Sequence, residues 1–422
     1  MDQMNLDSEV RIQGNYTRAD CTLLAFRFVG GKIVGHGRRS DKEGQYESGL
    51  PMKITGVEGI ILRLPVRQAV ADGTQDDLLI RIETDEGITG YGEVDTSPEV
   101  GRAVINAAMS HGTCYGLREI LMGMDPFDIE QIWEQMYRKT NYYGRLGVVL
   151  HAMSGVDMAL WDILGKAVGK PVHKLLGGSF CDEVRAYASM LMPETAQEVR
   201  DLVRRYAKQG FTAMKLGYGP LGKDVRRDVE LAAAAKEAAG PNVEVMIDIG
   251  HGYTLKMAMQ AAKEFESLGI YWMEEPFPPE AIEDYQRLCD STSLRIAAGE
   301  QDVGRWTFRR LIWEAHLDVI QPDISRVGGL TEAKRIAYMA HEANRVCVPH
   351  AFRTGVLVAA CLHLIAAIPN SAFLEFSVTD SALRRELLME PLKVVTGYVA
   401  VPAKPGLGIE LNAETIERYR VH

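Results

Sequence analysis

The chain has 422 residues, of which 46% are hydrophobic and 25% are charged, and its formal net charge at pH 7 is −10. This length exceeds that of an ordinary single core, so the sequence predicts a large domain accompanied by a smaller one. The acidic balance argues against nucleic acid or an anionic membrane surface as a partner, and we expect no apolar run that could span a bilayer.

The cysteines and the N-terminal residues bear on the cellular compartment. Six cysteines are scattered without a C-x-x-C pair, which is typical of reduced thiols rather than of a disulfide framework. Acidic residues precede the apolar stretch at 21–31 and no small-residue cleavage site follows it, so we expect no export signal. These features together predict a cytoplasmic protein.

Taken in chain order, residues 1–51 show little periodicity and are treated as an N-terminal extension. The stretch "MKITGVEGIILRLPV" then predicts a first strand, and "DLLIRIETDEGITGYGEV" has two apolar runs around an acidic glycine turn, as antiparallel hairpins do. Helical periodicity follows and ends in "GVVLHAMSGVDMALWDILGKAVGKPVHKLLGG". Residues 52–180 are therefore predicted to form an α+β capping domain.

Residues 181–380 have a different and more regular pattern, in which strand-length apolar runs alternate with amphipathic segments. The runs are "VRAYASM", "FTAMKLG", "VEVMIDIG", "IYWMEEP", "LRIAAGE", "DVIQPD", "VCVPH" and "FLEF". Eight such alternations imply parallel strands with crossover helices that close into a barrel. Residues 381–422 return to a hairpin-like pattern. The predicted fold class is α/β: a (β/α)8 TIM-type barrel with an α+β capping domain formed by the N-terminal region and the C-terminal tail.

Carboxylates mark the ends of three successive runs. Asp248, Glu274 and Glu300 follow one another at intervals of 26 residues, and a barrel gathers the carboxyl ends of its strands at one mouth. Carboxylates so close together would be protonated unless a cation neutralised them, and three oxygen ligands suit Mg²⁺. The alternative is that each acid pairs with a neighbouring base. The coincidence of three favours a magnesium site.

A second polar set lies at the other strand ends and consists of Lys215, Asp323, His350 and Glu375. An aspartate on a neighbouring strand end can fix the tautomer of a histidine and raise its basicity, which makes His350 a candidate general base with Asp323 as its partner. Six other histidines fall on predicted helices or loops and receive no role: His111, His151, His173, His316, His341 and His363.

The segment from Gly217 to Gly222 reads G-x-G-x-x-G, as a dinucleotide-binding turn would. Pro220 removes one backbone N–H from that turn, and the acid after the next strand, Asp248, already belongs to the carboxylate set. The glycine motif alone is weak evidence, so we do not predict a nucleotide site.

From residue 52 onward the chain resembles the mandelate racemase subgroup of the enolase superfamily (mandelate racemase/muconate lactonizing enzyme-like), of the acid-sugar dehydratase type. The segments that carry the resemblance are "SGVDMALWDILGKAVGKPVHKLLGG", "MEEP", "AAGE", "IQPDISRVGGLTEA" and "PHAF". The resemblance implies Mg²⁺ ligands at Asp248, Glu274 and Glu300, a His350–Asp323 dyad, and Glu375 as the acid that hydrogen-bonds a developing enediolate. It also implies a small-molecule carboxylate substrate, and we expect a homo-oligomer.

This chain departs from the family pattern at one lysine. The resembling family commonly has K-x-K-x-G, whereas residues 213–217 read A-M-K-L-G, so Lys215 lacks the cationic neighbour that would make it a better base. That difference disfavours a two-base racemase. Dehydration needs one base: His350 takes the proton, the β-hydroxyl leaves with a proton from His350, Lys215 or Tyr218, and the enol becomes a 2-keto-3-deoxy acid.

Substrate scope is harder to predict from one sequence. His251, Tyr218 and Arg353 are candidate substrate-binding residues, and the cap loops at residues 65–75 and 93–102 are expected to set specificity. We therefore predict a Mg²⁺-dependent dehydratase of an aldonate or aldarate. The alternatives are a racemase or epimerase that uses Lys215 and His350 on opposite faces, and a non-catalytic relative that binds sugar acids.

Overall fold

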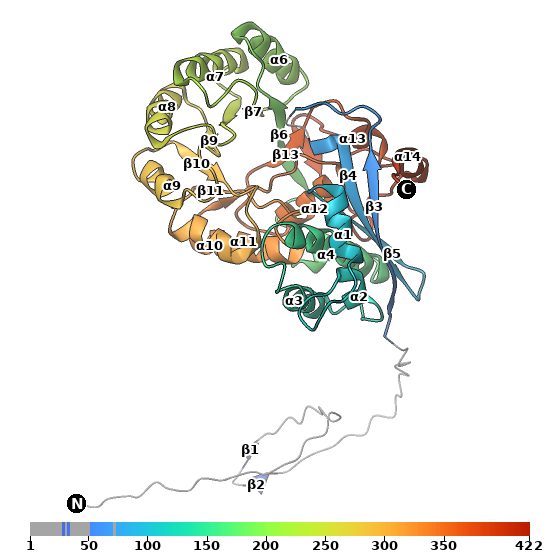
Figure 1. Ribbon diagram of the computed structural model, residues 1–422. Helices are drawn as coiled ribbons and strands as arrows, with labels where there is room; N and C mark the ends of the chain where they lie inside the picture. Colours follow the sequence, from blue (N-terminus) through green and yellow to red (C-terminus); the bar gives the residue numbers. More distant parts are fainter. Residues whose placement is uncertain (1–27, 30–31, 34–50, 71–72) are drawn as a thin grey trace, which may run out of the picture. The chain divides into compact units, whose positions relative to one another are not determined.

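The computed structural model describes residues 28–29, 32–33, 51–70 and 73–422 (Figure 1). Residues 1–50 and 51–422 form two separate units. In the first unit, β1 (Phe28–Val29) pairs antiparallel with β2 (Lys32–Ile33). Most of the predicted N-terminal extension lies outside the described residues.

The cap begins with an antiparallel sheet. Its strands are β3 (Ile54–Arg63), β4 (Asp76–Thr84) and β5 (Thr89–Val94), with the short helix η1 (Gly73–Gln75) before β4. The acidic turn between β4 and β5 makes the hairpin that the sequence predicts. Five helices follow: α1 (Pro98–Asn106), α2 (Leu117–Leu121), α3 (Ile129–Lys139), α4 (Val148–Ala167) and α5 (Val172–Leu175).

Helix α4 is the core helix of the cap. It packs so closely on β5 that a Cβ atom added to Gly92 would lie 2.0 Å from the carbonyl oxygen of Gly155, which only glycine avoids. By length and composition α4 could cross a membrane, so the expectation that no run is long enough was wrong. However, 78% of its most apolar window is buried inside the protein, as in the core helix of a soluble domain.

The barrel contains the eight predicted strands, all parallel. They are β6 (Glu183–Leu191), β7 (Ala213–Gly217), β8 (Glu244–Asp248), β9 (Trp272–Glu274), β10 (Arg295–Ala298), β11 (Val319–Ile320), β12 (Val346–Cys347) and β13 (Leu374–Ser377). Neighbouring strands follow the sequence from β6 to β12, and β13 pairs with the other edge of β6. This order is that of a (β/α)8 barrel, which confirms the predicted fold class.

Helices alternate with these strands and surround the curled sheet (Figure 1). They are α6 (Ala196–Lys208), α7 (Val225–Ala239), α8 (Leu255–Leu268), α9 (Ile282–Cys289), α10 (Gly304–Trp313), α11 (Gly329–Glu342) and α12 (Gly355–Ala366). Inside the sheet, one buried layer takes a side chain from every strand or its flank: Tyr187, Ala213, Met246, Trp272, Ala297, Val319, Val348 and Phe373. The barrel interior is therefore a packed core.

The C-terminal tail returns to the cap, as predicted. It contains α13 (Ala382–Glu386), β14 (Tyr398–Ala400), which pairs antiparallel with β6, and α14 (Ala413–Tyr419). The amide of Val421 then donates to the carbonyl of Ile61 in β3 at 2.8 Å. Cap strand and chain end are thus joined by backbone hydrogen bonding.

A buried glutamate of the capping domain binds the N-terminus of a barrel helix. Glu93, near the end of β5, accepts hydrogen bonds from the amides of Thr354 and Leu357 at 3.1 and 2.8 Å and from the Thr354 hydroxyl at 2.9 Å. These donors belong to the N-terminus of α12, where a carboxylate is favourable because the first amides of a helix have no partner within it. This contact fixes β5, and the loop after it, over the barrel.

Candidate active site

A cavity of about 300 Å³ lies where the carboxyl ends of the strands face the cap. The cap contributes Val70, Gly73 and Asp95, which come from the two loops that the sequence predicts to set specificity. Residues 71–72 of the first loop lie outside the described residues. The barrel contributes Ser189, Met190, Leu191, Lys215, Gly217, Tyr218, Asp248, Glu300, Gln301, Arg326, His350, Phe352 and Glu375. The site is therefore shared between two domains.

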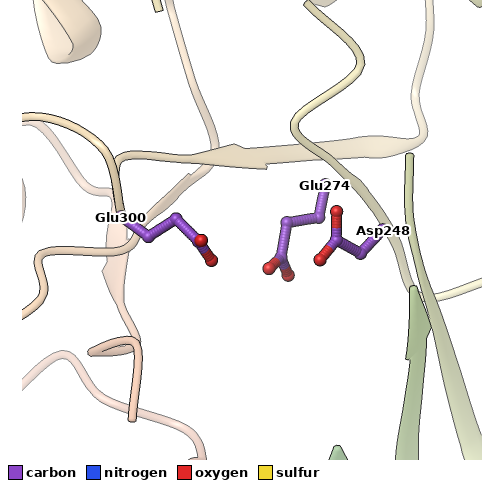
Figure 2. A group of neighbouring side chains, drawn as sticks. All are labelled: Asp248, Glu274 and Glu300. Carbon is purple, nitrogen blue, oxygen red and sulfur yellow. The ribbon is translucent and has the colours of Figure 1, made fainter. Parts of the chain in front are cut away.

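Asp248, Glu274 and Glu300 come together as the sequence predicts. One carboxylate oxygen from each lies within 4.8 Å of the others, and all three residues are buried (Figure 2). Glu274 is held in place by the Trp272 indole and the Gln321 amide, both at 2.9 Å. Burial and then the neighbouring Glu274 carboxylate raise the pKa of Asp248 well above its usual value. Three buried oxygen donors that repel one another fit a divalent cation such as Mg²⁺.

Lys215 is engaged with these carboxylates. Its ammonium group contacts Glu274 and lies 2.9 Å from Glu375 Oε1 and 3.9 Å from Asp248 Oδ2. Burial alone would lower the pKa of this lysine, but Glu274 and Glu375 raise it well above its ordinary value. In this arrangement Lys215 is a charged hydrogen-bond donor.

His350 and Asp323 form the predicted pair. A parallel bridge joins the two backbones, and Nδ1 of His350 lies 2.6 Å from Oδ2 of Asp323. The second aspartate oxygen accepts from the amide and hydroxyl of Ser325 at 2.7 and 2.5 Å. Burial alone would lower the pKa of the imidazole, but the surrounding carboxylates, first Glu300 and Glu375, raise it to about 10. With Nδ1 bound to Asp323, Nε2 is the nitrogen available to a substrate.

The surroundings of Glu375 favour a different protonation state from the one that the resemblance implies. Oε1 of Glu375 accepts from the Ser189 hydroxyl at 2.7 Å as well as from Lys215, and its Oε2 accepts from the Ala351 amide at 2.8 Å. Burial alone would raise the pKa of Glu375, but the Lys215 and His350 charges and these hydrogen bonds lower it to about 2. The arrangement favours an ionised carboxylate over the protonated acid that the resemblance implied.

The three candidate substrate-binding residues have different positions. Tyr218 lines the cavity just after β7, with a left-handed backbone (φ 57°). His251 is not among the lining residues, and its Nε2 lies 2.7 Å from Glu275. Arg353 is buried under the cap, where it contacts the Gly73 carbonyl. The structure brings only Tyr218 to the cavity, because cap docking covers Arg353 and Glu275 holds His251.

The glycine motif at residues 217–222 uses its amides within the protein. The Tyr218 amide donates to the Asp248 carbonyl at 3.1 Å, and the Gly222 amide donates to Asp228 Oδ2 at 3.1 Å. These amides are therefore already satisfied, and the geometry agrees with the prediction that the motif is no nucleotide turn.

Sequence reasoning missed an arginine and its partner. Arg326 Nη2 lies 2.6 Å from Asp95 Oδ2, and Arg326 Nη1 donates to the Glu300 carbonyl at 3.0 Å. Both side chains line the cavity. The only sequence signals were the position of Arg326 three residues after Asp323 and that of Asp95 in a cap loop already singled out.

Two parts of the chain match known protein families. Residues 54–177 match the mandelate racemase/muconate lactonizing enzyme N-terminal domain, and residues 198–415 match the enolase C-terminal domain-like family. The chain is 35% identical to the D-galactarolactone cycloisomerase of Agrobacterium fabrum, over 82% of this chain and 91% of that protein. It is also 35% identical to a D-galactonate dehydratase of Pectobacterium atrosepticum, over 87% and 95%.

A solved structure has the same fold. The 3,6-anhydro-D-galactonate cycloisomerase from Zobellia galactanivorans is 32% identical, with a TM-score of 0.79 over 88% of this chain and all of that one. Acid-sugar enzymes with different reactions thus share this architecture.

Proposed function

Because the chain belongs to the mandelate racemase/muconate lactonizing enzyme family of the enolase superfamily, we propose that it is a Mg²⁺-dependent dehydratase of an acid sugar. One observation carries the proposal. His350 and two members of the carboxylate triad, Asp248 and Glu300, line one cavity, and the Nε2 atom of His350 lies 3.4 Å from Glu300 Oε2. A base is thus placed next to the site where a metal would hold a carboxylate substrate.

Asp248, Glu274 and Glu300 would hold Mg²⁺, which when bound supplies positive charge that acidifies the proton α to the substrate carboxylate. A cation held by the triad would offset the Glu300 charge that raises the pKa of His350, and neutral His350 would then take the α-proton on Nε2 while Asp323 fixes the tautomer and stabilises the resulting imidazolium. Lys215, charged and buried beside Glu375, offers a hydrogen bond to the negative charge that develops on the substrate oxygen. The β-hydroxyl then leaves as water with a proton from His350, Lys215 or Tyr218, and the enol rearranges to a 2-keto-3-deoxy acid.

The surroundings of Lys215 favour this one-base chemistry. The charged groups in contact with its ammonium, among the described residues, are carboxylates, and these favour its protonated form. A base on the face opposite His350 would need a neutral amine. Lys215 therefore serves as a donor, which dehydration can use and two-base racemisation cannot.

The test is a screen of purified protein against aldonates and aldarates, with and without Mg²⁺. We expect a Mg²⁺-dependent 2-keto-3-deoxy product from at least one acid. Proton exchange at the α-carbon in D₂O without keto product would replace dehydration by epimerisation. If every acid gives neither keto product nor proton exchange, the proposal is contradicted.

A further inference from the structure

The described lining residues of the cavity offer no uncommitted permanent positive charge. Among the described lining residues, the permanent cations are Lys215 and Arg326. Lys215 is held by Glu274 and Glu375, and Arg326 is held by Asp95 and the Glu300 carbonyl. Neither cation can bind a second substrate carboxylate without giving up a buried anionic partner or a carbonyl.

Asp95 lines the cavity from the cap. It lies at the end of β5, is 8% exposed, and its amide donates to the Ser325 carbonyl at 3.3 Å. One of its oxygens lies 2.6 Å from Arg326, and the other lies 3.4 Å from Arg353. Asp95 is therefore fixed by barrel residues on both sides, although it belongs to a cap loop.

The guanidinium groups around Asp95 are already paired with carboxylates. The two guanidinium groups, those of Arg326 and Arg353, lie within 4.0 Å of four carboxylates: Asp77, Glu93, Asp95 and Asp323. A further carboxylate placed there would face the Asp95 carboxylate and would find both guanidinium groups already paired. A terminal hydroxyl would instead find acceptors, namely Asp95 and, on the same cavity wall, the Gln301 side chain.

We propose that Asp95 is a specificity-determining residue that selects acid sugars with one carboxylate and a terminal hydroxyl (aldonates) over those with a carboxylate at both ends (aldarates). The inference rests on the proposed function, because it assumes that the first carboxylate lies at the metal triad. Charge repulsion and an unsatisfied second carboxylate act in the same direction, since a like charge at an interface typically costs several kcal/mol.

The test compares acids of identical stereochemistry that differ only at the terminal carbon: galactonate with galactarate, and gluconate with glucarate. We expect kcat/KM for the preferred aldonate to exceed that for its aldarate by about 100-fold or more. In Asp95→Asn the loss of charge frees Arg326 for the second carboxylate, so this ratio should fall at least about tenfold, chiefly through a lower KM for the aldarate. A ratio that stays unchanged in Asp95→Asn would overturn the inference.

Two further variants separate selection from structural damage. Asp77→Asn removes a carboxylate that lies 3.4 Å from Arg353 but does not line the cavity, so the aldonate-to-aldarate ratio should stay at the wild-type value. Val70→Arg adds a cation at a lining position that is 48% exposed, and it should improve aldarate turnover without touching the Asp95 contacts. Failure of Val70→Arg to change the ratio, together with an unfolded Asp95→Asn, would also overturn the inference.

Equilibrium binding measures the preference for aldonates separately from catalysis. Calorimetric titration of His350→Asn with each acid in the presence of Mg²⁺ measures selectivity without turnover. Tighter aldonate binding, even if wild-type protein yields no keto acid, would support the selectivity while the dehydratase proposal fails. Equal binding of both acids, or binding of neither, would overturn the selectivity.

Discussion

Oδ2 of Asp323 lies 2.6 Å from Nδ1 of His350, although the two residues are 27 positions apart in the chain. The distance is fixed by backbone pairing, since a parallel bridge joins the same two residues beyond the ends of β11 and β12. The imidazole is therefore oriented by the barrel itself. Only Nε2 remains to meet a substrate.

Replacing Asp323 by asparagine should test this orientation. Asparagine keeps the size of the side chain but cannot stabilise an imidazolium, so kcat should fall on the order of 10² to 10⁴-fold with little change in KM. Steady-state kinetics on the acid identified by screening measure the effect. Asp290→Asn is the matched control, because it alters an exposed Asp–His pair with His316 that is remote from the cavity. Equal kinetics in the two variants would remove Asp323 from the mechanism.

Replacing Glu274 by glutamine should weaken Mg²⁺ binding on the order of 100-fold, since one of three anionic oxygen donors is lost. Calorimetric titration with Mg²⁺ measures the affinity directly, and circular dichroism checks that the barrel remains folded. The exposed Glu264 on α8 provides the control Glu264→Gln, which should bind Mg²⁺ like the wild-type protein. Unaltered affinity in Glu274→Gln would place the metal elsewhere.

Proton exchange can separate the roles of His350 and Lys215. We expect His350→Asn to abolish both dehydration and deuterium incorporation at the α-carbon, because no other group takes the proton. Lys215→Met should stop product formation yet retain some exchange catalysed by His350. NMR in D₂O follows both, with Lys223→Met as an exposed control. The reverse order, exchange persisting without His350 and lost without Lys215, would assign the abstraction to Lys215.

A prediction on pH dependence concerns stability, far from the catalytic groups. His363 on α12 is fully buried; its Nε2 lies 3.0 Å from the Leu407 carbonyl and its Nδ1 accepts from the His173 amide at 3.2 Å. Burial lowers the pKa of His363 to about 4 from 6.5. Between these values the unfolded chain binds the proton and the folded chain does not, so stability is lost as pH falls from 6.5 towards 4, by up to about 3 kcal/mol.

Urea unfolding at pH 7 and at pH 4.5 measures this loss. His363→Gln removes the titrating group, and its free energy of unfolding should decline less between the two pH values than that of the wild-type protein. His341→Gln makes the same change at an exposed position on α11 and should behave like the wild type. If His363→Gln and wild type lose the same stability, His363 does not carry this pH dependence.

The sequence was sufficient for those groups whose positions follow from strand order. Glu274 ends a parallel strand, and every neighbouring strand ends at the same mouth, so its meeting with Asp248 and Glu300 needed only the count of strands and the chain direction. The same argument placed Asp323 beside His350. Periodicity also sufficed for the return of the tail to the cap.

The groups that sequence reasoning misplaced depend on contacts between domains or between distant strands. Arg353 follows a barrel strand, yet Asp77 and Asp95 of the cap surround it, and no periodic pattern encodes how a cap docks. The lowered pKa of Glu375 likewise depends on the charges of Lys215 and His350 and on donors from Ala351 and Ser189, which belong to other parts of the barrel. Such partners become visible only in three dimensions.

The capping of α12 by Glu93 has a consequence for how the protein denatures. A cap that separated from the barrel would give up the hydrogen bonds of Glu93 to the Thr354 and Leu357 amides, at a net cost of about 1 kcal/mol for each bond. Partial unfolding of one domain therefore destabilises the other. Residues 51–422 should melt in one cooperative transition, and the barrel cut free of its cap should be a poor folding unit.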